Sequence, residues 1–121
     1  MRVFKNRWFT RFARKESISD KELRDIVNQL EAGQADADLG GDVYKVRMSR
    51  PGKGKSGGYR VIVFFKSEER TFFIYGFAKS DRANIDQGEL QAFKKDARYD
   101  FSLTDEQIRD RIKKGTLIEV I

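Results

Sequence analysis

Residues 43–66 read VYKVRMSRPGKGKSGGYRVIVFFK, and the interpretation of the whole chain starts from this stretch. Two apolar runs, 43–49 and 59–66, flank a connection that holds four glycines and the single proline of the chain. Runs of this kind on either side of a Gly- and Pro-containing connection predict an antiparallel hairpin. The second run is apolar at nearly every position, which is typical of a central strand covered on both faces.

The same stretch carries the positive excess of the chain. It contains seven Lys or Arg residues and no acidic one, whereas residues 1–42 carry eight of each sign and residues 67–121 carry ten basic and eleven acidic residues. The formal net charge of +6 is thus concentrated in 43–66. A local basic excess is typical of a surface that binds a polyanion. A solvated loop whose lysines only aid solubility gives the same charge pattern, and this alternative stays open.

Composition limits the chemistry that the chain can perform. The length of 121 residues predicts one domain over residues 1–121. The chain has no cysteine and no histidine, which excludes disulfides, thiolate chemistry and imidazole acid–base catalysis. No apolar run approaches the roughly 18 residues of a membrane-spanning helix, and the N-terminus lacks the apolar core of a signal peptide. We therefore expect a cytoplasmic protein in which Lys, Arg, Tyr, Ser, Thr or carboxylate side chains carry any chemistry, and we expect no cofactor.

Helix and strand patterns outside the hairpin predict an α+β fold. Ser19, Asp86 and Thr104 each stand three residues before Glu or Gln, which is the capping-box signature of a helix start. Apolar patterns predict further strands at 2–6, 70–78 and 116–121 and a first helix at 7–15. The order β-α-α-β-β-β-α-α-β predicts a small antiparallel sheet, with its meander over 43–78, and helices packed on one side.

The first predicted helix, 7–15, mixes aromatic and basic side chains. One Trp and two Phe residues recur at helical spacing beside Arg7, Arg11 and Arg14. Such a cluster can form a platform on which nucleic-acid bases stack. An aromatic stripe at helical spacing is more often part of the core, and this interpretation is favoured here.

Four cations are predicted to converge on one face of the sheet. Lys45 and Arg47 are two residues apart, so their side chains leave the strand on the same side. Arg60 opens the neighbouring strand, and Lys79 follows the strand after it. Like charges at close range repel each other. A phosphate group bound between these cations would offset the repulsion and would explain why they lie together. The alternative is that these side chains extend into water from a solvated face.

Two other motifs lack the residues that their chemistry requires. The sequence Gly54-Lys55-Ser56 is similar to the end of a nucleotide-binding P-loop, but Ser49 stands where that motif needs Gly, and a strand follows instead of a helix. The aspartates of the loop at 34–42 lack the glycine and the closing glutamate of a calcium loop. The Gly-rich connection instead suits close approach to a nucleic-acid backbone, with Lys53 and Lys55 presented to it.

Three segments, in this order and spacing, resemble the RelE/ParE superfamily of bacterial toxins, and most closely the HigB-like branch of RelE toxins. They are Tyr44-Lys45-Val46-Arg47, residues 57–63 and residues 73–81. The resemblance implies a small α+β toxin that is encoded beside an antitoxin, expected to be a helix-turn-helix protein. It further implies a ribosome-dependent endoribonuclease (an mRNA interferase) that cleaves messenger RNA without a metal and thereby inhibits translation. In this chemistry a 2′-hydroxyl attacks the adjacent phosphate.

The resemblance also assigns roles to single residues. Lys45 is expected to act as the base. Arg47 and Arg60 are expected to neutralise the pentavalent phosphorane, and Lys79 to lie near the leaving oxygen. Contacts to the RNA backbone are expected from Lys53, Lys55 and Arg82.

The resemblance leaves two questions open. Some relatives use a histidine or a C-terminal tyrosine, and this chain has neither at the corresponding place, so the general acid is not identified. The superfamily also contains gyrase inhibitors. A gyrase inhibitor, an RNA-binding module that does not cleave, and an inactive member kept as a partner for its antitoxin are therefore the alternatives to a nuclease.

Overall fold

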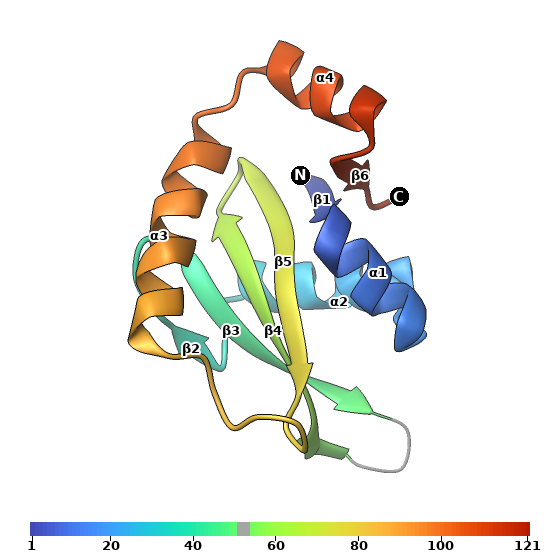
Figure 1. Cartoon of the computed structure of the whole chain (residues 1–121), viewed down its shortest axis with the longest axis vertical. Helices are drawn as coiled ribbons and strands as arrows, with labels where there is room; N and C mark the ends of the chain where they lie inside the picture. Colours follow the sequence, from blue (N-terminus) through green and yellow to red (C-terminus); the bar gives the residue numbers. More distant parts are fainter. Residues whose placement is uncertain (51–53) are drawn as a thin grey trace.

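The computed structural model describes residues 1–50 and 54–121 of the chain. Three strands form the antiparallel meander predicted over 43–78 (Figure 1): β3 at Val43–Arg50, β4 at Gly54–Lys66 and β5 at Arg70–Ala78. The β3–β4 hairpin is longer than the apolar pattern predicted, because β4 begins at Gly54 and pairs there with Arg50. Ladder pairing with a neighbouring strand can hold a segment whose own composition favours a loop.

Short strands near both ends of the chain extend the sheet. β1 (Arg2–Asn6) runs parallel to β5, β6 (Leu117–Glu119) runs antiparallel to β1, and β2 (Ala37–Asp38) borders β3. The strand order is β2-β3-β4-β5-β1-β6. The sheet is therefore mixed, which corrects the prediction of a wholly antiparallel sheet. A long connection with two helices separates β1 from the meander, and such crossovers allow parallel pairing.

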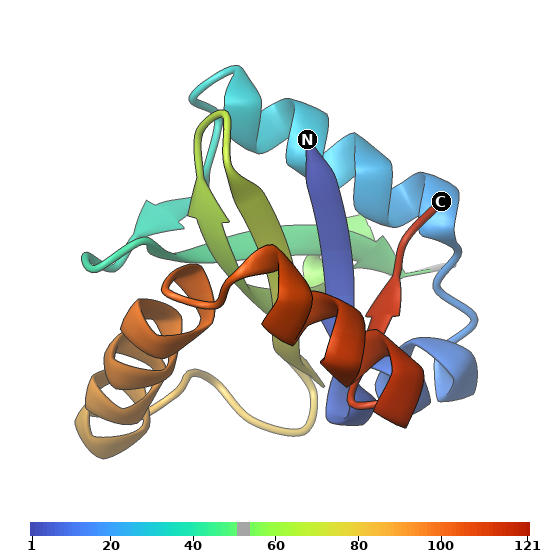
Figure 2. The ribbon, with the colours of Figure 1, turned by 90° about the horizontal axis from the view of Figure 1, so that it is seen from above.

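The helices cover both faces of the sheet (Figure 2), which corrects the prediction that they pack on one side. Their bounds are α1 at Arg7–Lys15, α2 at Asp20–Glu31, α3 at Gln87–Phe101 and α4 at Asp105–Lys114. Helices α1 and α2 share a hydrophobic cluster with Val61 and Val63 of β4, whereas α3 and α4 share another with Ile62 and Phe64. A strand with apolar residues on both faces needs cover on both.

Local capping explains where three of these helices begin. Ser19, Asp86 and Thr104 each complete the capping box predicted from the sequence. Helix α4 ends at Gly115, whose φ of 77° lies in the left-handed region that favours glycine. Within the described part of the chain, no helix combines the length and the apolar character that crossing a membrane requires.

Candidate functional site

Two arginines face each other across the β3–β4 hairpin. Arg47 on β3 is the direct cross-strand partner of Arg60 on β4, and Lys45, two residues earlier on β3, pairs with Ile62. Residues opposite each other in an antiparallel pair point to the same face of the sheet, here the face on which α3 packs. Directly opposed like charges destabilise a sheet, so strand pairing does not account for this arrangement.

These three cations differ in their exposure to solvent. Arg60 is only 6% exposed, and its Nη1 donates to the carbonyl oxygen of Tyr59 at 3.4 Å. Lys45 is half-buried and Arg47 is exposed. Among the described residues, neither Lys45 nor Arg47 forms an ion pair with a carboxylate. An anion can therefore approach these two side chains without breaking an internal ion pair.

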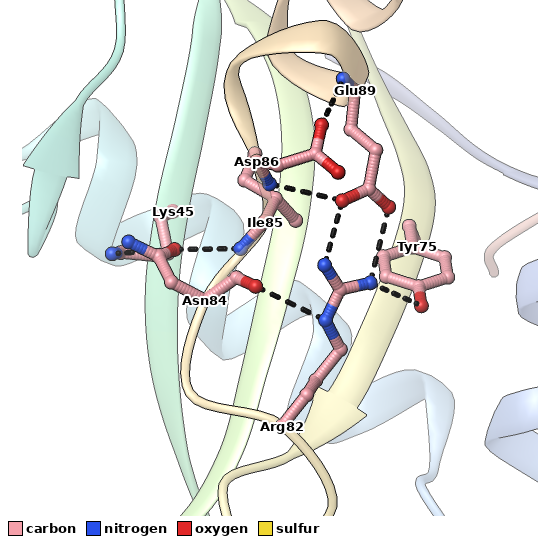
Figure 3. Close-up of polar contacts among 7 residues, drawn as sticks. All are labelled: Lys45, Tyr75, Arg82, Asn84, Ile85, Asp86 and Glu89. Carbon is pink, nitrogen blue, oxygen red and sulfur yellow. Dashed lines mark hydrogen bonds and ion pairs between the residues drawn. The ribbon is translucent and has the colours of Figure 1, made fainter.

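The loop that follows β5 folds back against Lys45 (Figure 3). The Nζ of Lys45 donates to Oδ1 of Asn84 at 3.2 Å, and the same oxygen accepts from the backbone N–H of Ile85 at 2.9 Å. The amide oxygen is neutral, so it orients the lysine without neutralising its charge. Asn84 lies in a polar loop without periodicity, and no sequence pattern pointed to this contact.

Arg82 lies in the same loop and contacts groups of its own chain. Its terminal nitrogens donate to both carboxylate oxygens of Glu89, at 2.6 and 3.0 Å, and its Nε donates to the carbonyl oxygen of Asn84 at 3.0 Å. Nη1 also donates to the hydroxyl of Tyr75 at 3.2 Å, and the guanidinium lies 5.4 Å from the centre of the Phe77 ring. This pairing raises the pKa of Arg82 and lowers the pKa of Glu89 to about 2.

The other predicted cations are placed as follows. Lys79 is exposed at the end of β5, where its backbone N–H donates to the carbonyl oxygen of Gly58 on β4 at 3.0 Å. Lys53 lies outside the described residues, as does the side chain of Lys55. The structure thus brings Lys45, Arg47 and Arg60 to one face, with Lys79 at a neighbouring strand end. Arg82, predicted to contact RNA, uses most of its N–H donors in hydrogen bonds to groups of its own chain.

Sequence reasoning missed the residues that hold this loop: Tyr75, Asn84 and Glu89. Glu89 did carry a signal, because it is the capping-box partner of Asp86 and accepts from the Asp86 backbone N–H at 2.9 Å. The same carboxylate that begins α3 also binds Arg82 (Figure 3). One side chain therefore joins the start of the helix to the loop that contacts Lys45.

A model of one known protein family matches nearly the whole chain. The matching model is described as the RelE toxin of the RelE/RelB toxin–antitoxin system, and it matches residues 1–120. The matched range includes the cations of β3 and β4, the loop after β5 and all four helices.

Proposed function

Because this chain belongs to the family of RelE toxins of RelE/RelB toxin–antitoxin systems, we propose that it inhibits translation by cleaving messenger RNA. Family membership makes it the toxin of such a system and implies an antitoxin partner. The proposal extends to cleavage on the ribosome, to a place in the HigB-like branch and to a helix-turn-helix antitoxin. The observation that supports it is the cross-strand pair of Arg47 and Arg60 with Lys45 on the same face.

The proposed reaction uses the three cations of this face together with Lys79 at the neighbouring strand end. The 2′-hydroxyl of one nucleotide loses its proton to the side-chain nitrogen of Lys45, which acts as the base, and its oxygen bonds to the adjacent phosphorus. The bond from phosphorus to the 5′-oxygen breaks, which leaves a 2′,3′-cyclic phosphate and a 5′-hydroxyl, and the ammonium of Lys79 supplies the proton to the leaving oxygen. Arg47 and Arg60 stabilise the negative charge that develops on the phosphorane.

The loop after β5 positions the base in this proposal. The hydrogen bond to Oδ1 of Asn84 holds the side-chain nitrogen of Lys45 in place on the sheet face that would meet the RNA. Glu89 holds the loop through Arg82, so both residues influence the reaction through Lys45. The contact of Arg82 with the RNA backbone stays part of the proposal, beside this positioning role.

The test is translation in a cell-free extract with wild-type protein and with the Lys45→Ala and Arg47→Ala variants, whose side chains reach solvent. Wild-type protein is expected to slow translation and to create new 5′-hydroxyl RNA ends. Each variant is expected to lower the cleavage rate by about 10²–10³-fold, the usual effect of losing an acid–base or charge-stabilising group. Arg109→Ala, which removes an exposed arginine of α4, is the matched control and is expected to cleave normally. Wild-type protein that neither slows translation nor creates such ends refutes the proposal.

A further inference from the structure

Helix α1 carries a second basic surface, on the sheet face opposite to α3. Its nine residues include no acidic residue and four cations, which are Arg7, Arg11, Arg14 and Lys15. All four are exposed, and in the part of the chain that the structure describes none of them forms an ion pair. Cations of other elements, such as Lys5, Lys21 and Arg70, do pair with carboxylates.

Helix stability does not account for this charge. Arg14 and Lys15 lie in the last turn, where the helix dipole favours cations. Arg7 opens the helix, where the dipole opposes a cation, and the first turn contains no acidic residue to offset it. Arg11 lies between the two ends. A polyanionic ligand would account for all four cations, whereas the helix dipole accounts only for Arg14 and Lys15.

An exposed tryptophan lies on the same stripe of the helix. Trp8, Arg11 and Lys15 are spaced i, i+3 and i+7, so their side chains leave α1 on one face. Trp8 is 37% exposed, yet its ring packs 4.5 Å from the Tyr75 ring and 5.3 Å from the Phe12 ring, measured between centroids. The indole is therefore held in place while part of it stays open to solvent.

Two hollows adjoin this tryptophan. One, of about 220 Å³, is lined by Trp8, Arg11, Phe12 and Lys15. The other, of about 240 Å³, lies between α1 and β5, shares Trp8, Phe12 and Lys15, and extends to Arg82. The second hollow connects α1 to the loop whose Asn84 contacts Lys45.

We propose that this surface of α1 binds unpaired RNA, with a base stacked on Trp8 and the backbone phosphates held by Arg11 and Lys15. An aromatic platform flanked by cations is the general means by which proteins bind single strands. The inference rests on the proposed function, because it supplies a second contact for the RNA that the β3–β4 face cleaves. An acidic protein segment would match the cations but would not account for the exposed part of the Trp8 ring.

The chain has one tryptophan, so its fluorescence reports on this site alone. The probe is a single-stranded RNA of about ten nucleotides, within the span of single-strand binding sites, with 2′-O-methyl groups that prevent cleavage by 2′-hydroxyl attack. We expect the RNA to quench Trp8 emission. The R11A/K15A variant is expected to raise the Kd about 10-fold and to reduce the slope of log Kd against log salt by about 1.4, the value for two phosphate contacts.

The R109A/K113A variant of α4 is the matched control, because it removes two exposed cations at the same i, i+4 spacing. Its Kd is expected to stay within about 2-fold of wild type, since a distant charge pair adds only a screened contribution. An abasic strand of equal length is expected to bind with little quenching. The inference is overturned if RNA does not quench Trp8, if the abasic strand quenches equally, or if both double variants weaken binding equally.

The uncleavable probe separates this inference from the proposed function. Protein that cleaves no messenger RNA but shows quenching that depends on α1 refutes the nuclease proposal alone. Protein that cleaves messenger RNA but shows no quenching refutes the inference about α1 alone.

Discussion

At the scale of single residues, Gly76 sets how closely α1 approaches β5. A Cβ atom at this position would lie 2.5 Å from Cε2 of Phe12, closer than such atoms can approach. Phe12 lines both hollows beside Trp8, so the missing side chain at Gly76 helps to position the aromatic surface of α1.

We predict that Gly76→Ala lowers the free energy of unfolding by about 1–3 kcal/mol, the usual cost of overpacking. Urea unfolding measures the change. Because the clash is with Phe12, the cost of Gly76→Ala is expected to be smaller in a Phe12→Ala background than in the wild type. Equal costs in the two backgrounds would show that the Phe12 contact is not the cause.

A second residue, Asp100 on α3, makes stability depend on pH. Burial, with a smaller contribution from Asp96, raises the pKa of Asp100 from its ordinary 3.8 to about 6. The folded protein therefore binds the proton more tightly than the unfolded chain between about pH 4 and pH 6, and stability falls as pH rises through that window.

Asp100→Asn removes the charge that burial disfavours. We predict a free energy of unfolding higher than wild type by on the order of 1–3 kcal/mol at pH 7.5, and no difference below about pH 4. Urea unfolding at both pH values measures this. Asp81→Asn, at an exposed aspartate, is the control and is expected to change little at either pH. A difference between Asp100→Asn and wild type that is the same at both pH values contradicts the prediction.

At the scale of elements, the start of α3 and the loop after β5 behave as one unit. Glu89 accepts from the backbone N–H of Asp86 and from Arg82, so the helix cap and the loop share a carboxylate. The lowered pKa of Glu89, about 2, means that this stabilisation is present above its ordinary value of 4.5 and is lost as the pH falls toward 2.

We predict that Glu89→Gln speeds amide exchange at Ile85 and lowers the rate of RNA cleavage about 10-fold, because the loop that orients Lys45 loosens. Hydrogen-exchange spectra and counts of new RNA 5′ ends measure the two effects. Glu22→Gln is the matched control, since Glu22 holds the same capping-box position in α2. Cleavage that drops equally in both variants would indicate a general loss of stability.

At the scale of the whole molecule, β4 joins two hydrophobic clusters. Its side chains alternate between the cluster under α1 and α2 and the cluster under α3 and α4. Leu23 and Ile108, one in each cluster, are both fully buried. Since the clusters share the same strands, we expect them to unfold together, as the proposal of one domain over residues 1–121 requires.

Leu23→Ala and Ile108→Ala are each predicted to lower the free energy of unfolding by about 2–5 kcal/mol. In each variant, the urea midpoint of unfolding is expected to shift by the same amount whether it is followed by Trp8 fluorescence or by circular dichroism. Trp8 belongs to α1, whose buried residues Phe9 and Ala13 lie in the first cluster, whereas Ile108 lies in the second. A Trp8 midpoint that does not move in Ile108→Ala would indicate that the two clusters unfold separately.

Much of the candidate site could be predicted from sequence, but not its loop. Lys45, Arg47 and Arg60 were placed on one face because strand alternation and hairpin pairing follow from neighbouring residues. Nothing in the local pattern pairs Arg82 with Glu89, seven residues away across a loop and a helix start, so the sequence indicates only its contact with RNA, which stays a prediction. The sequence did show the cations of α1 beside its aromatic residues, but helical spacing favoured a place in the core, and only the structure showed that Trp8 stays partly exposed.

By itself, the sequence determined the α+β class, the meander over 43–78, the three capping boxes and the exclusion of cysteine and histidine chemistry. These features depend on residues within one turn, one strand or one hairpin. Only the tertiary structure decided that β1 lies parallel to β5, that helices cover both faces, and that Asn84 contacts Lys45. Those contacts join residues far apart in the chain. Local preferences of the backbone do not specify them, so they form only when the whole molecule packs.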